Sequence, residues 1–113
     1  MSEQVHDHGR VVLHQVDQQG LGLADGDRKW KEPWSVINRV VAGLVPDGDH
    51  LILITLLGLG TERVIVVTED EPIWLNMHLA FAQYLPGARS YSDWVADARG
   101  RKGMHVVFKG WPD

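Results

Sequence analysis

The segment 50-HLILITLLGLGTERVIVVT-68 determines the fold class of this chain. Two apolar runs of strand length, residues 50–57 and 63–68, flank a glycine-rich turn sequence at residues 58–61. Two such runs joined by a short loop that contains glycine predict an antiparallel hairpin. Because apolar residues follow one another without polar alternation, we expect both strands to lie centrally in a sheet or to be buried on both faces.

The segment before this hairpin carries a helical pattern. Pro33 suits the first turn of a helix, where its missing N–H group costs nothing. Apolar residues then recur at helical spacing up to the turn sequence at residues 46–49, and this stripe consists of Trp34, Ile37, Val41 and Leu44, flanked by Val36 and Val40. The spacing predicts a helix over residues 34–44, and its β-branched residues weaken that prediction.

A second helix is predicted directly after the hairpin. The carboxylates of Glu69, Asp70 and Glu71 precede Pro72, a combination that favours the positively polarised start of a helix. The helix ends at Pro86, and its broad apolar face consists of Ile73, Trp74, Met77, His78, Phe81, Tyr84 and Leu85.

The two ends of the chain complete the predicted fold. A shorter helix around residues 93–99 precedes a strand at residues 104–109, and an N-terminal hairpin spans residues 10–24. Leaving out the first strand, the order is strand, helix, strand, strand, helix, strand, which is the split βαβ or ferredoxin-like arrangement with helices on one sheet face. We therefore expect one α+β domain over residues 10–113, preceded by a flexible polar tail at residues 1–9. Either the N-terminal hairpin or another chain would cover the second face of the sheet.

Composition excludes several functional classes. The chain has 113 residues and no cysteine, which removes disulfides, thiolate catalysis and zinc–thiolate sites. A net charge of −4 argues against nucleic acid as a partner, because phosphate backbones are repelled. No apolar run reaches the length of a membrane span and no signal peptide is visible, so we expect a cytoplasmic protein without a membrane partner.

Six histidines raise the hypothesis of a metal or catalytic site. His6 and His8 lie in the predicted tail, whereas a metal site needs a rigid set of three or four ligands. The other histidines fall in or beside predicted strands and helices, and spacing does not show whether any pair shares a pocket; they are His14, His50, His78 and His105. No phosphate loop, dinucleotide fingerprint or nucleophile elbow is present, so we predict no cofactor, metal or catalytic residue.

The preferred hypothesis is a small acidic module that binds a protein. Small, acidic, cysteine-free chains with few motifs include inhibitors of the immunity-protein or antitoxin kind, which is an analogy of class and matches no family motif. An acidic surface can neutralise a basic partner and speed its capture. The predicted contact residues are Asp47, Asp49, Glu69, Asp70 and Glu71, with Trp30 and Trp34 as apolar anchors.

Two other functions stay open at this point. One is a small-molecule-binding or enzymatic ferredoxin-like domain with histidines around a pocket, and the other is a self-assembling accessory subunit or homodimer. Acidic residues gathered on one convex face would favour the inhibitor, and a deep pocket with two or more of the four histidines would favour the enzyme. The basic cluster of Arg99, Arg101 and Lys102 is interpreted as a solvated turn rather than an anion site.

Overall fold

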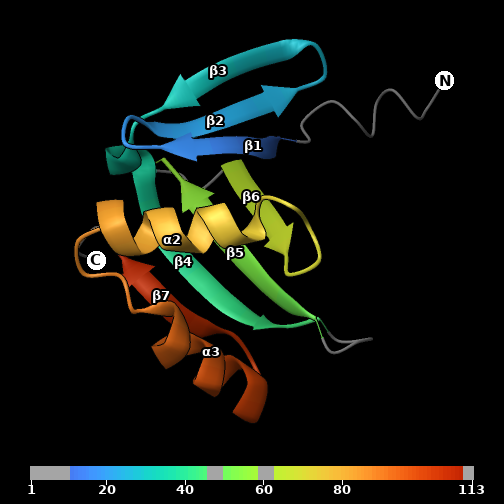
Figure 1. Ribbon diagram of the computed structural model, residues 1–113, viewed down its shortest axis with the longest axis vertical. Coiled ribbons are helices and arrows are strands. Elements are labelled where there is room, and N and C mark those ends of the chain that lie inside the picture. Colours follow the sequence, from blue (N-terminus) through green and yellow to red (C-terminus); the bar gives the residue numbers. More distant parts are fainter. Residues whose placement is uncertain (1–10, 46–49, 59–62, 111–113) are drawn as a thin grey trace, which may run out of the picture.

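The computed structural model describes residues 11–45, 50–58 and 63–110 and shows an α+β domain with two antiparallel sheets and two helices (Figure 1). Sheet A has the order β1-β2-β3 and consists of β1 (Val12–Asp17), β2 (Gly20–Asp25) and β3 (Arg28–Glu32). Sheet B has the order β6-β5-β4-β7 and consists of β4 (Ile37–Leu44), β5 (Leu51–Leu57), β6 (Arg63–Thr68) and β7 (His105–Lys109). The helices α2 (Trp74–Tyr84) and α3 (Tyr91–Gly100) connect β6 to β7, and a short 3-10 helix, η1 (Trp34–Val36), precedes β4. The predicted tail at residues 1–9 lies outside the described residues.

Both predicted hairpins are present. Strands β5 and β6 pair antiparallel with Ile54 opposite Val66, and β1 pairs antiparallel with β2. Strand β3 is not predicted by the sequence, because its segment 28-RKWKE-32 carries four charged residues around Trp30. Charged side chains are frequent on edge strands because they prevent pairing with other chains. Among the strands that the structure describes, β3 pairs with β2 alone and is therefore such an edge.

The helix predicted over residues 34–44 is wrong. Only Trp34–Val36 form one helical turn, and residues 37–44 form β4, which lies between β5 and β7 in the middle of sheet B. Valine and isoleucine fit a pleated strand better than a helix. A strand with apolar residues on both faces also matches a helical template by chance. The order in this part of the chain is therefore β4, β5, β6, α2, α3, β7, and the predicted split βαβ order is not found.

One face of sheet B forms the floor of the hydrophobic core. Both helices lie on that side of the sheet (Figure 1), and sheet A joins the same core through Leu13, Leu21 and Leu23. Alternate residues of β4, β5 and β6 are buried there, namely Val40, Ala42, Leu51, Leu53, Ile65 and Val67. They pack with buried residues of the two helices, namely Trp74, Met77, Phe81, Trp94 and Ala98.

The described residues leave the opposite face of sheet B largely open. We define the open face by the apolar residues that alternate with the core positions, namely Val41, Ile52, Ile54, Leu56, Val64, Val66 and Val106. On the two edge strands, Val64, Val66 and Val106 are 41%, 48% and 46% exposed. Of the two alternatives expected for these strands, a central position in the sheet is found for β5, whereas β6 is an edge strand and is not buried on both faces. The alternative in which the N-terminal hairpin covers this face is wrong, because that hairpin belongs to the core on the helix side.

Candidate functional site

The acidic segment of residues 69–71 joins β6 to α2 and holds that turn in place. Glu69 accepts hydrogen bonds from the Leu51 backbone N–H at 2.9 Å and from the Arg99 guanidinium at 2.6 Å. The carboxylate of Glu71 accepts a hydrogen bond from the Thr68 backbone N–H at 2.8 Å. Two of the three carboxylates of this segment are thus engaged in stabilising the fold.

Asp70 is the exposed member of this segment. Its carboxylate accepts a hydrogen bond from the Thr68 hydroxyl, and this bond is the main cause that lowers the pKa of Asp70 below its usual range. Asp70 therefore stays ionised at neutral pH and presents its charge to solvent. Asp47 and Asp49, the other predicted acidic contacts, lie outside the described residues.

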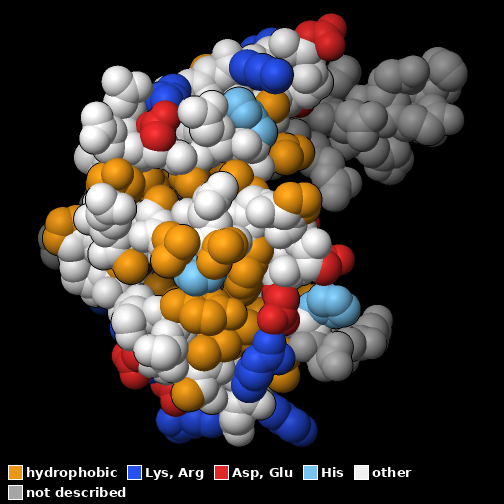
Figure 2. All heavy atoms as spheres, in the orientation of Figure 1, with side chains coloured by type: hydrophobic (Ala, Val, Ile, Leu, Met, Phe, Trp, Pro, Cys, Tyr) orange, Lys and Arg blue, Asp and Glu red, His pale blue; other side chains and the backbone are white. Residues whose placement is uncertain are grey.

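Helix α2 presents an exposed apolar surface that sequence reasoning missed. We define the α2 patch as Leu75, His78, Leu79 and Tyr91. Leu75 and Leu79 are 58% and 54% exposed, and they lie one turn apart on α2 with His78 beside them. Figure 2 shows apolar side chains gathered around a histidine over α2 and the start of α3, with charged side chains along one border. The available signal was that both leucines fall outside the predicted apolar face of this helix.

His78 and Tyr91 connect the α2 patch to the core. Their rings stack with centroids 3.9 Å apart and planes 15° apart. Trp74 and Trp94 lie beneath them as a buried edge-to-face pair with centroids 6.1 Å apart. Burial lowers the pKa of His78, so the imidazole is neutral at pH 7 and adds to the apolar character of the patch.

The two predicted tryptophan anchors stabilise sheet A and its contact with α2. Trp34 donates its indole N–H to the carbonyl of Asp17 at 2.9 Å, and its ring packs on Phe81 and Tyr84 at 5.7 and 5.6 Å. Trp30 donates its indole N–H to Glu32 at 3.0 Å and lies 5.2 Å below the Arg28 guanidinium. Both are partly buried, and neither belongs to the α2 patch or the acidic segment.

The described histidines do not share a pocket. His14 is exposed on β1, His50 lies near Asp70, and the His105 ring hydrogen-bonds the carbonyl of Arg101 at 3.1 Å. Two pockets of about 520 and 350 Å³ are lined by other residues. Within residues 11–45, 50–58 and 63–110, no group of three or more histidine, aspartate or glutamate side chains could hold a metal ion. His6 and His8 lie outside those residues.

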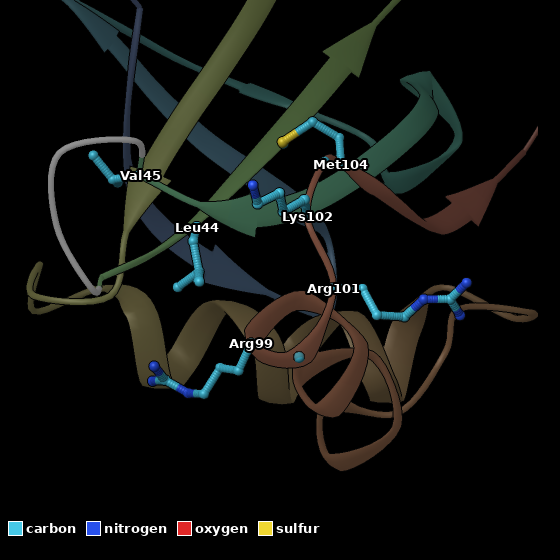
Figure 3. Close-up of a pocket in the computed structure, with 8 residues that line it drawn as sticks. Leu44, Val45, Arg99, Arg101, Lys102 and Met104 are labelled. Carbon is cyan, nitrogen blue, oxygen red and sulfur yellow. The ribbon is translucent and has the colours of Figure 1, made fainter.

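The larger pocket lies where α3 turns into β7 and contains the basic cluster of the sequence (Figure 3). The guanidinium groups of Arg99 and Arg101 point in opposite directions, and Arg99 already pairs with Glu69. Cations at the last turn of a helix are favourable because they compensate the exposed carbonyl groups there. This arrangement agrees with a solvated helix end, because the cations do not converge on one anion.

Comparisons with known proteins add no assignment to this geometry. No family model, no curated protein and no solved structure matches the chain. None of the helices in the described part of the chain is long and apolar enough to cross a membrane. The surfaces that could bind a partner are therefore the α2 patch, the acidic segment and the open face of sheet B.

Proposed function

We propose that this chain is a protein-binding module that contacts its partner through the α2 patch and the adjoining acidic segment. The observation that supports this most is the exposure of Leu75 and Leu79, which together with the stacked His78 and Tyr91 form one continuous apolar surface. Contiguous exposed apolar patches rimmed by polar residues are characteristic of protein interaction sites. Aromatic residues at their centre supply large contact areas.

The border of the patch indicates the chemistry of the partner. The ion pair of Glu69 with Arg99 links the turn between β6 and α2 to the end of α3, and Asp70 adds an exposed carboxylate in the same turn. With a net charge of −4, the whole chain attracts positively charged surfaces. The proposed partner is therefore a protein with an apolar patch bordered by lysine or arginine. Its more specific form is inhibition, in which this chain occludes a functional surface of a basic protein.

The experiment is to recover the partner from the native host and to compare three forms of the chain as bait. Wild type and Val12→Lys are expected to retain the same partner, identified by mass spectrometry. Val12 is also an exposed apolar residue, but it lies on sheet A. The double variant Leu75→Lys, Leu79→Lys is expected to lose that partner, because lysine keeps its charge in water and opposes a dry contact. Association with the purified partner is expected to slow as ionic strength rises, because salt screens exposed charges. Retention by the double variant would contradict the proposal.

The burial of His78 predicts a pH dependence of stability. Because the pKa of His78 is lower in the folded chain than its ordinary value of 6.5, the unfolded chain takes up this proton first as the pH falls. The free energy of unfolding is therefore expected to decrease below pH 6.5 and to level off below the folded pKa. Urea denaturation at a series of pH values checks this, with His78→Gln as the control. Equal pH profiles of the wild type and the variant would show that His78 does not cause the effect.

A further inference from the structure

The open face of sheet B is a second apolar surface, on the side of the molecule opposite the two helices. Its central row runs straight across all four strands, because Val106 pairs with Val41, Val41 with Ile54, and Ile54 with Val66. The neighbouring row places Leu56 beside Val64 on β5 and β6. A face with valine, isoleucine and leucine at these positions has the composition of the inner side of a two-sheet sandwich.

The open face is large enough for two copies to bury the area that a specific interface requires. The four strands of sheet B have 8, 7, 6 and 5 residues. With strands about 4.8 Å apart and a rise of about 3.3 Å per residue, they give a projected area of about 410 Å². Two copies packed face to face therefore cover about 800 Å² in projection. The accessible area buried is larger, because side chains stand out of the pleat. The total reaches the roughly 1,000 Å² that a specific interface requires.

Charge on the open face is confined to one end. Arg39 and Lys109 pair across β4 and β7 at the end where β4 begins, and Ile52 and Thr68 pair at the other end. A two-fold axis that lies between two facing sheets and runs across the strands places the cationic ends of the two copies at opposite ends of the interface. The apolar row through Ile54 and Val66 then faces its own counterpart, as a self-complementary interface requires.

We propose that two copies of this chain pack open face against open face and form a homodimer with an apolar sandwich interior. A second copy is the occupant that fits this face, because the surface is apolar and the two-fold arrangement keeps the cationic ends apart. This surface is separate from the α2 patch, so the dimer leaves both patches free for partners. The dimer is therefore independent of the proposed partner-binding function.

The test is the mass of the purified full chain in solution, measured by sedimentation equilibrium over a wide concentration range. The wild type is expected to approach twice its 12.7 kDa as concentration rises. Val66→Lys is expected to weaken the dimer by about 100-fold or more, because an unpaired charge would lie in a dry interface. Val12→Lys is the matched control, since Val12 and Val66 are both 48% exposed valines on edge strands and Val12 lies outside the open face. Circular dichroism of each variant verifies that the fold is retained.

Three results would overturn the proposal. A wild-type chain that stays monomeric at every concentration would do so, as would a dimer that Val66→Lys leaves intact. The third is a monomeric full chain that becomes dimeric only when residues 1–10 are removed, which would assign the open face to that segment. If Val66→Lys loses the fold, Val64→Lys on the same strand provides the equivalent test, because Val64 is also exposed on this face.

Discussion

Replacing Trp94 with alanine is expected to lower the free energy of unfolding by about 3–5 kcal/mol, the cost of a large buried aromatic side chain and the cavity that it leaves. Trp94 is 2% exposed and contacts the rings of Trp74 and Tyr91 at centroid distances of 6.1 and 5.1 Å. Its indole therefore holds α3 against the start of α2. Urea denaturation of the wild type and the variant measures the difference.

A matched control separates this packing effect from a general effect of truncation. Leu75→Ala on the exposed side of α2 is expected to change the free energy of unfolding by less than about 0.5 kcal/mol, as surface substitutions usually do. Comparable losses of free energy of unfolding for Trp94→Ala and Leu75→Ala would contradict the packing of α3 against α2 through Trp94.

Two leucines on β5 provide the second large expected effect, because they point to opposite faces of sheet B. Leu53→Ala is expected to lower the free energy of unfolding by about 2–5 kcal/mol, since Leu53 is fully buried beneath the helices. Leu56→Ala is expected to cost much less in the monomer, because Leu56 lies on the open face and is only partly buried. Urea denaturation in the Val66→Lys background, where dimerisation is suppressed, measures both.

The difference in free energy of unfolding between Leu53→Ala and Leu56→Ala shows whether one face or both faces of sheet B are covered. Equal and large losses would mean that both faces of sheet B are covered within one chain. Equal and small losses of free energy of unfolding would mean that β5 is not an inner strand that contributes to the core. Either result would contradict the arrangement in which both helices and sheet A join the core on one side of sheet B.

The sequence predicted the elements whose patterns admit a single interpretation. The β5–β6 hairpin combines two apolar runs with a glycine-rich turn, and α2 and α3 have clear apolar stripes with helix-ending signals. Strand β4 was mistaken for a helix because Trp34, Ile37, Val41 and Leu44 satisfy a helical period. These residues in fact divide between a helical turn, the core and the open face. Only the pairing of β4 with β5 and β7, which is a tertiary effect, separates the two interpretations.

The candidate site was predicted less completely than the fold. Their charge marked Glu69, Asp70 and Glu71 as contact residues. Charge alone does not predict the hydrogen bonds that fix Glu69 and Glu71 in the turn, and Glu69 bonds to Leu51 on a different strand. Leu75 and Leu79 are ordinary residues whose significance depends on exposure, and exposure follows from packing. The sequence did raise the question of what covers the second face of the sheet, and the structure excludes the N-terminal hairpin as the answer.

The most direct test of a partner-binding α2 patch is to measure affinity and stability together for one substitution, Leu79→Lys, with the purified partner. Leu79 is 54% exposed, so its replacement is expected to leave the free energy of unfolding within about 0.5 kcal/mol of the wild type. At the same time, partner affinity is expected to fall by about 100-fold, as for the loss of an interface hot spot of 2 kcal/mol or more. Unchanged affinity, or a loss of affinity that only follows a loss of stability, would contradict the account.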